Sequence, residues 1–225
     1  YRALHKCGGF LVDGTFLTIY IIHHRLLNVP ILQIKDPIAG ACKETGMQIP
    51  VVRNVLEANE KMAAHVRKRL SDSGILTLNL ISSPGAGKTT LLERTLTDLA
   101  GEFRMAVVEG DLQTDNDARR VAATGAQAVQ INTDGGCHLD SNMILTALDS
   151  LDLEGVDILF IENVGNLVCP VEFDCGEDAK VALLSVAEGD DKPEKYPLLF
   201  NLAQALVLNK VDLLPLSLIH ISEPT

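Results

Sequence analysis

A glycine-rich segment at residues 82–90 has the residue types that hold a phosphate. It matches the pattern G-x-x-x-x-G-K-[ST], with Ser82 at the place of the first glycine. Gly85 and Gly87 allow backbone N–H groups to wrap an anion, and Lys88 is expected to contact the β- and γ-phosphates. The hydroxyl of Thr89 is expected to coordinate Mg²⁺. The predicted nucleotide contacts in this loop are Ser83, Pro84, Gly85, Ala86, Gly87, Lys88, Thr89 and Thr90.

A second motif, the N-K-x-D at residues 209–212, indicates which base the nucleotide carries. The carboxylate of Asp212 can accept two hydrogen bonds from guanine, whereas adenine offers no donor at those positions. Asn209 and Lys210 are expected to brace the loop and flank the base. Four residues make a weak pattern, but its place after the last predicted strand favours guanine and argues against an ATP-dependent kinase.

Two further strand ends are expected to bring carboxylates to the same nucleotide. Asp111 follows an apolar run and is predicted to bind Mg²⁺ directly or through water. Residues 162–165 have the form E-x-x-G, in which Glu162 would position a water molecule and the Gly165 N–H would sense the γ-phosphate. The alternative for both carboxylates is a charge on a solvated loop. We therefore predict Lys88, Asp111, Glu162 and Gly165 as the catalytic group.

A cysteine and a histidine are neighbours at Cys137 and His138, and Cys169 follows Gly165 closely. A thiol beside an imidazole offers two metal ligands, and Cys169 adds a third. A helix predicted to start at Leu139 would lower the pKa of the Cys137 thiol toward the metal-binding thiolate. The alternative is that the pair is incidental and Cys169 is a small buried residue.

The composition excludes several classes of partner. A net charge of −11 and a pI near 4.9 argue against nucleic acid and against an anionic membrane surface. No stretch reaches the roughly 18 apolar residues of a membrane helix. The 5 cysteines are odd in number and irregularly spaced, which favours a reducing compartment. We expect a soluble, cytoplasmic protein.

Strand and helix signals alternate along the part of the chain that carries these motifs. Apolar runs of strand length occur at residues 75–81, 105–109, 127–131, 157–161, 180–186 and 205–208. Helical patterns occur at 88–99, 115–123 and 139–148, and an amphipathic helix is predicted at 51–70. This order predicts an α/β P-loop NTPase fold, with a mostly parallel sheet, helices on both faces and a preceding amphipathic helix.

Five segments together resemble one known family. They are residues 78–92, 108–120, 136–140, 162–170 and 185–197. They are similar to the HypB family of nickel-incorporation GTPases in hydrogenase maturation, which belongs to the SIMIBI class of P-loop GTPases. The resemblance covers residues 47–215, which we assign to one GTPase domain lacking the family's C-terminal strand and helix.

The resemblance implies a GTP-hydrolysing metallochaperone that serves [NiFe]-hydrogenase and couples its GTP state to metal binding and dimerisation. In that family, the residues matching Cys137, His138 and Cys169 bind Ni²⁺ or Zn²⁺ where two protomers of a homodimer meet. The implied partners are the nickel accessory protein HypA and the precursor of the hydrogenase large subunit.

Residues 1–46 match that family poorly, and residues 216–225 match nothing in it. We interpret residues 1–46 as a poorly ordered or non-native extension, with a metal-binding arm of Cys7, His23, His24 and Cys42 as the alternative. Residues 216–225 are interpreted as a non-native tail.

Two other functions remain open. A urease-type nickel GTPase is disfavoured, because a Cys-Pro-His arrangement is expected there in place of Gly136-Cys137-His138-Leu139. A non-hydrolysing metal-storage or interaction protein is disfavoured because the sequence has no histidine-rich tract.

Overall fold

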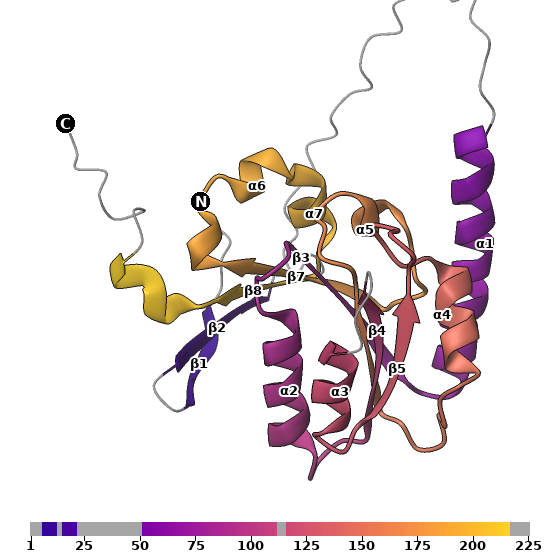
Figure 1. Cartoon of the computed structure of the whole chain (residues 1–225), viewed down its shortest axis with the longest axis horizontal. Coiled ribbons are helices and arrows are strands. Elements are labelled where there is room, and N and C mark those ends of the chain that lie inside the picture. The colour runs from indigo at the N-terminus through magenta and orange to yellow at the C-terminus, as the bar shows by residue number, and fades with distance from the viewer. Residues whose placement is uncertain (1–5, 13–14, 22–50, 112–115, 217–225) are drawn as a thin grey trace, which may run out of the picture.

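A single sheet runs through the part of the chain that the computed structural model describes, namely residues 6–12, 15–21, 51–111 and 116–216 (Figure 1). Its strands are β1 (Lys6–Val12), β2 (Thr15–Ile21), β3 (Leu76–Ser82), β4 (Met105–Asp111), β5 (Gln127–Asn132), β6 (Ile158–Glu162), β7 (Ala179–Ser185) and β8 (Ala205–Asn209). The order across the sheet is β1-β2-β8-β7-β3-β6-β4-β5, and the strands from β3 to β8 pair in parallel. The predicted parallel α/β sheet is confirmed.

Helices cover both faces of this sheet. The longer ones are α1 (Val51–Asp72), α2 (Lys88–Leu99), α3 (Asn116–Ala122) and α4 (Ser141–Leu148), and the short ones are α5 (Cys169–Glu172), α6 (Lys192–Lys195) and α7 (Pro197–Leu202). Figure 1 shows α2 and α3 side by side on one face, away from α1 and α4. None of the described helices combines the length and the apolar character needed to cross a bilayer.

The central strands are buried on both faces, which explains why they read as continuous apolar runs. Val107 of β4 belongs to the apolar cluster that contains Leu92 of α2, whereas Val108 belongs to the cluster that contains Ile144 of α4. Successive side chains of a strand point to opposite faces, so β4 contributes to both clusters. A third cluster joins Ile81 of β3 to α5 and α7.

Two predicted boundaries differ from the structure for local reasons. The helix predicted at 139–148 begins at Ser141, because Asp140 is its N-cap and accepts a hydrogen bond from the Met143 N–H at 2.8 Å. The strand predicted to reach Val186 ends at Ser185, which forms a capping box with Glu188 over the 3₁₀ turn η1 (Val186–Glu188). Leu139 therefore lies in a loop.

The edge of the sheet contains a hairpin that sequence analysis did not predict. β1 and β2 pair antiparallel with each other, and β2 pairs antiparallel with β8 from Thr18↔Leu208 to Ile21↔Ala205. Of the suggested metal-binding arm, His23, His24 and Cys42 lie outside the described residues, and Cys7 is described only by its place in β1. Residues 217–225 also lie outside them.

Candidate functional site

The loop between β3 and α2 has a backbone that only glycine adopts easily. Gly85 has φ 74° and Gly87 has φ 101°, both in the left-handed region. A Cβ at Gly87 would also collide with the side-chain amide of Asn209. The loop is therefore shaped for close approach of its N–H groups to an anion at the start of α2.

The N-K-x-D segment, which begins at the last residue of β8, hydrogen-bonds to the backbone of this loop. Asn209 Nδ2 donates to the Ala86 carbonyl at 2.8 Å, and Lys210 Nζ donates to the Gly85 carbonyl at 2.8 Å. Asp212 lies in the 3₁₀ helix η2 (Val211–Leu216), where its side chain is exposed. Asn209 and Lys210 therefore brace the loop through its carbonyl groups, and the contact of Asp212 with a base stays a prediction.

Lys88 lies at the first position of α2 and is buried. Its Nζ donates to Ser82 Oγ at 3.1 Å, and Ser82 Oγ in turn donates to the Ser83 carbonyl at 2.8 Å. Burial lowers the pKa of Lys88, and the nearby Glu162 carboxylate partly opposes this change. The serine that replaces the first glycine of the motif therefore provides Lys88 with a hydrogen-bond partner.

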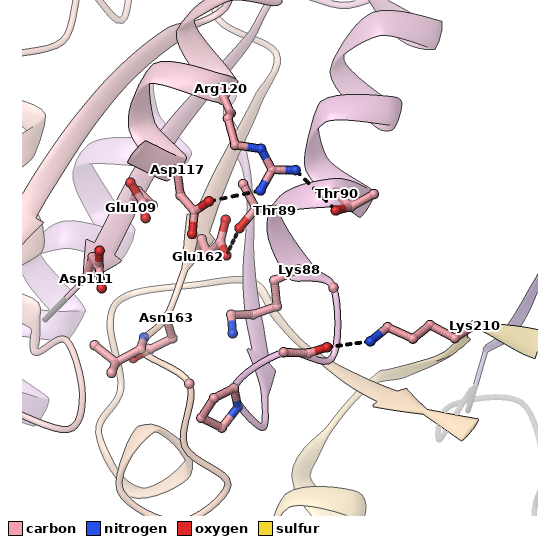
Figure 2. Close-up of a pocket in the computed structure, with 16 residues that line it drawn as sticks. Lys88, Thr89, Thr90, Glu109, Asp111, Asp117, Arg120, Glu162, Asn163 and Lys210 are labelled. Carbon is pink, nitrogen blue, oxygen red and sulfur yellow. Dashed lines mark hydrogen bonds and ion pairs between the residues drawn. The ribbon is translucent and has the colours of Figure 1, made fainter. Parts of the chain in front are cut away.

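A cavity of about 440 Å³ opens at the carboxyl ends of β3, β4 and β6 (Figure 2). Ligands of open parallel sheets bind at such strand ends. Its lining residues are Pro84, Gly85, Gly87, Lys88, Thr89, Thr90, Glu109, Gly110, Asp111, Asp117, Arg120, Glu162, Asn163, Val164, Gly165 and Lys210. The whole predicted catalytic group is among them. The predicted contacts Ser83, Ala86, Asn209 and Asp212 do not line it.

Two buried carboxylates lie side by side in this cavity. The ladder between β4 and β6 pairs Glu109 with Glu162, and their exposed fractions are 2% and 4%. Burial and the charge of Glu162 raise the pKa of Glu109 to about 8. Burial raises the pKa of Glu162 to about 7, against the opposing effects of Lys88 and a 2.8 Å hydrogen bond from Thr89 Oγ1.

These carboxylates fit a hard divalent cation. Among the residues that the structure describes, the Oε2 atoms of Glu109 and Glu162 have no hydrogen-bond partner. A hydroxyl from Thr89 and the carboxylate of Asp111 line the same cavity. Oxygen donors of this kind suit Mg²⁺, and a cation between them would remove the energetic cost of two adjacent buried charges.

The raised pKa values predict how stability depends on pH. A Glu109 carboxyl with a pKa of 4.5 when unfolded and about 8 when folded contributes stability that is complete below pH 4.5 and lost as pH rises through about 8. Without nucleotide and Mg²⁺, the free energy of unfolding should fall across this range, and Glu109→Gln should flatten the fall. Glu162 acts in the same direction, so some slope should remain. Urea unfolding at a series of pH values measures how the free energy of unfolding changes with pH.

The control for this prediction is Glu102→Gln, since Glu102 is an exposed residue outside the cavity. The control should keep the wild-type slope. A difference between Glu109→Gln and wild type that is the same at every pH would contradict the assignment.

Sequence analysis gave no role to several residues that line the cavity, notably Glu109, Asp117, Arg120 and Asn163. Arg120 donates to Asp117 at 3.0 Å and to Thr90 Oγ1 at 3.2 Å, so α3 is linked to the start of α2 (Figure 2). Glu109, Asp117 and Arg120 belong to segment 108–120, which carried the family resemblance. The resemblance of that segment was therefore the signal in the sequence that could have identified these three residues.

The three predicted soft ligands come together in a second group. One ligand atom from each of Cys137, His138 and Cys169 lies within 4.8 Å of the others, and all three residues are half-buried. Cys137 Sγ lies 3.6 Å from His138 Nδ1, and the His138 ring packs on Phe173 with ring centroids 3.8 Å apart. Two thiols and an imidazole are the ligand types that Zn²⁺ and Ni²⁺ accept.

The fold changes the pKa values of two members of this group, Cys169 and His138. The helix predicted to start at Leu139 begins at Ser141, so Cys137 lies in the loop before the N-cap Asp140. The pKa of Cys169 is raised, chiefly by its hydrogen bond with Cys137. Burial lowers the pKa of His138, which favours the neutral imidazole that binds metal.

The part of the chain that builds these two sites matches a known protein family. Residues 76–222, more than half of the chain, match the family described as CobW/HypB/UreG, nucleotide-binding domain. The chain belongs to the CobW/HypB/UreG family. Within this family, it is 57% identical over 162 residues to "Hydrogenase maturation factor HypB" of Escherichia coli (strain K12), which covers 72% of the chain and 56% of that relative.

Other members of the family give the same picture. The chain is 45% identical over 179 residues to "Hydrogenase/urease maturation factor HypB" of Helicobacter pylori (strain J99), covering 78% of the chain and 73% of the relative. A crystal structure of HypB from Helicobacter pylori in complex with nickel superposes with a TM-score of 0.68 at 47% identity, over 71% of this chain and 75% of that one. The chain spans about half the length of the first curated relatives it matches, at 56%.

Proposed function

We propose that this protein is a GTP-hydrolysing nickel metallochaperone that acts in the maturation of [NiFe]-hydrogenase. The observation that carries the proposal is that residues 162–169 run from the cavity to the thiol-imidazole group. Glu162 and Gly165 line the nucleotide cavity, and Cys169 belongs to the thiol-imidazole group. The names of the relatives, a hydrogenase maturation factor and a HypB in complex with nickel, support this cargo and this destination.

In this proposal, the loop of residues 83–90 binds the phosphates of GTP, and Lys88 neutralises charge on the β- and γ-phosphates. Thr89 and Asp111 would hold Mg²⁺, and Glu162 lines the same cavity. The cation supplies further neutralisation of the charge that develops on the phosphates during hydrolysis. Glu162 also orients water, and Asp212 selects guanine.

Gly165 is the residue that senses the γ-phosphate in this proposal. A Cβ at Gly165 would lie 2.9 Å from Pro84 Cα, so its backbone already lies against the phosphate loop. Movement of the Gly165 peptide toward the γ-phosphate would move Cys169, because only three residues separate them. Metal affinity and nucleotide state would then be linked, and such a link is reciprocal for binding.

The same proposal includes the partners of the protein. Three ligands leave a tetrahedral zinc site one short, so a homodimer in which two groups meet completes the coordination of Zn²⁺ or Ni²⁺. The implied partners are HypA, as the nickel accessory protein, and the precursor of the hydrogenase large subunit. The odd number and irregular spacing of the 5 cysteines support the cytoplasm as the compartment.

A second destination, urease, has a specific observation in its favour. The Helicobacter pylori relative has a name that includes urease, at 45% identity. The relative with 57% identity is named for hydrogenase alone, and this difference favours hydrogenase. A metal-storage role without hydrolysis predicts no GTP turnover.

Nucleotide selectivity tests the nucleotide half of the proposal. Asp212→Asn turns one acceptor into a donor that faces a donor of guanine, so GDP affinity should fall by about one to two orders of magnitude. Xanthine nucleotides should gain affinity. Titration with GDP and XDP measures both, and GTP turnover with and without Ni²⁺ and Zn²⁺ separates an enzyme from a store. Unchanged GDP affinity in the variant would contradict the role of Asp212.

A further inference from the structure

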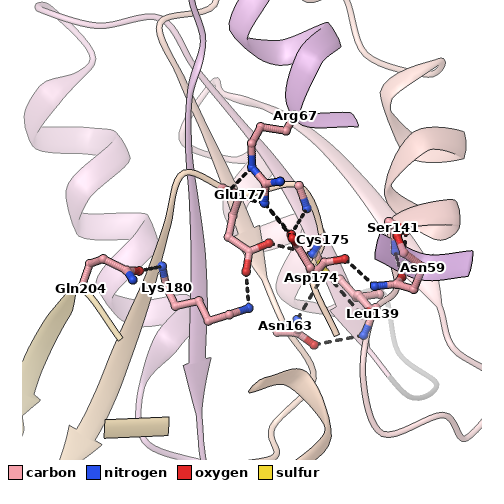
Figure 3. Close-up of polar contacts among 11 residues, drawn as sticks. Asn59, Arg67, Leu139, Ser141, Asn163, Asp174, Cys175, Glu177, Lys180 and Gln204 are labelled. Carbon is pink, nitrogen blue, oxygen red and sulfur yellow. Dashed lines mark hydrogen bonds and ion pairs between the residues drawn. The ribbon is translucent and has the colours of Figure 1, made fainter. Parts of the chain in front are cut away.

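A cluster of buried polar groups joins the end of β6 to the residue that follows the Cys137-His138 pair (Figure 3). At its centre is Asn163, which follows Glu162 directly and whose exposed fraction is 0%. Its Oδ1 accepts hydrogen bonds from the N–H groups of Leu139 at 3.1 Å and Val164 at 3.0 Å. Its Nδ2 donates to Asn79 Oδ1 at 3.3 Å. The end of β6 is thereby bonded to the segment that carries Cys137 and His138.

Leu139 is the residue of that segment that receives these contacts. It follows His138, it is fully buried, and its carbonyl accepts a hydrogen bond from Cys175 Sγ at 3.3 Å. Its side chain packs on Gly110, where an added Cβ would lie 2.7 Å from Leu139 Cγ. Gly110 stands between Glu109 and Asp111, so Leu139 contacts the ends of both β4 and β6.

Breaking the contacts between Leu139 and the end of β6 is energetically unfavourable. A buried N–H that loses its acceptor keeps the full cost of its desolvation, and close-packed side chains transmit displacement. A shift of the β6 end therefore either moves the Leu139 peptide with it or leaves buried groups unpaired. Moving that peptide also moves His138, which precedes it in the chain.

We infer that Asn163 is a positioning residue that links the nucleotide state at the end of β6 to the Cys137-His138 half of the metal site through the Leu139 peptide. The inference rests on the proposed function and adds a second connection to it. Cys169 moves with Gly165 along the chain, whereas Cys137 and His138 move through a hydrogen bond across the fold. Nucleotide exchange then displaces both halves of the site together.

The reactivity of individual thiols tests this inference without any metal. Metal-free protein is alkylated with iodoacetamide in the presence of GDP or a non-hydrolysable GTP analogue. The rates at Cys137 and Cys169 are read separately from their peptides by mass spectrometry. In the wild type, we expect both rates to differ between the two nucleotides by about fivefold or more, as for a typical coupling between sites.

The variants separate the two connections. Asn163→Ala removes the acceptor of the Leu139 N–H, and the nucleotide ratio at Cys137 should fall below about twofold while the ratio at Cys169 persists. Asn163→Ser, whose side chain is shorter, should give the same result if the alanine variant does not fold. Asn163→Asp keeps the acceptor oxygen and should restore the ratio at Cys137.

Ser141→Ala is the matched control. Ser141 is buried, lies close to Leu139 in the chain, and hydrogen-bonds to Asn59 at 2.8 and 2.9 Å rather than to β6. This variant should lose stability and keep both ratios. A Cys137 ratio that is unchanged in Asn163→Ala, or that falls equally in Ser141→Ala, would overturn the inference.

The proposed function fails in a different way. Equilibrium dialysis of the wild type with Zn²⁺, with GDP and with the GTP analogue, measures whether nucleotide changes metal affinity. If the Zn²⁺ affinity is the same with GDP and with the GTP analogue while the alkylation rates still depend on the nucleotide, the proposed function alone is contradicted. If the zinc affinity of the wild type depends on the nucleotide but the alkylation rate of Cys137 does not, the role of Asn163 alone is overturned.

Discussion

Lys88→Ala should lower GTP turnover by about 10²–10³-fold, the loss expected when one fixed electrostatic group is removed from a transition state. Lys88 is a buried cation in the predicted catalytic group, and its Nζ faces a cavity whose other charged groups are mainly carboxylates. Without it, negative phosphates would face Glu162 and Glu109 with one cation fewer. Single-turnover hydrolysis at saturating GTP measures the chemical step directly.

The same substitution should leave the fold intact. The Lys88 side chain makes one described hydrogen bond, to Ser82 Oγ, and burial already lowers its pKa. Alanine also favours the helix that starts at this residue. The melting temperature without nucleotide should therefore stay close to that of the wild type.

An exposed lysine provides the control for this prediction. Lys195 of α6 forms an ion pair with Asp191, the N-cap of that helix, and does not line the cavity. Lys195→Ala should keep wild-type turnover. Wild-type turnover in Lys88→Ala would mean that the phosphate loop is misassigned.

The sequence was sufficient to predict the elements of the domain because each buried strand is a continuous apolar run. The runs at 105–109 and 127–131 start at the first residues of β4 and β5, and the helix at 88–99 has the bounds of α2. These signals are local, since hydrophobic period and the glycine-rich turn lie within a few residues. The N-terminal hairpin lacked such a signal and depends on pairing with β8, which is distant in sequence.

The site was predictable only where a motif marks it. Glu109 was missed because its importance comes from pairing with Glu162 across the β4–β6 ladder, which the sequence does not specify. Asn163 occupies an unspecified position of the E-x-x-G motif, and its hydrogen bond to Leu139 spans 24 residues. The raised pKa of Cys169 likewise arises from Cys137, which the fold brings close.

Cys137→Ala and Cys169→Ala should each weaken Zn²⁺ and Ni²⁺ binding by about 100-fold or more, since losing a direct ligand costs at least as much as losing a supporting one. Cys137, His138 and Cys169 hold their ligand atoms within 4.8 Å of one another in half-buried positions. Removing either thiol leaves each chain with two ligands instead of three and takes a thiolate away from any site that two chains share. Equilibrium dialysis with each metal measures the affinity.

Cys175→Ala is the control that separates a ligand from any cysteine. Cys175 is fully buried, forms no disulfide, and lies outside the described three-ligand group. Its loss should leave metal affinity near the wild-type value. Binding in the wild type should weaken as pH falls, because protons compete for thiolates and imidazole.

The dependence of binding on protein concentration decides whether two chains share the metal. If the site is completed by a second copy, zinc should promote dimerisation in sedimentation, and a GTP analogue should strengthen that effect because Gly165 and Cys169 share one segment. Cys169→Ala should lose both effects, whereas Cys175→Ala should keep the zinc effect. Equal zinc affinity in the wild type and both ligand variants would mean that Cys169 is only a packing residue and that the Cys137-His138 pair is incidental.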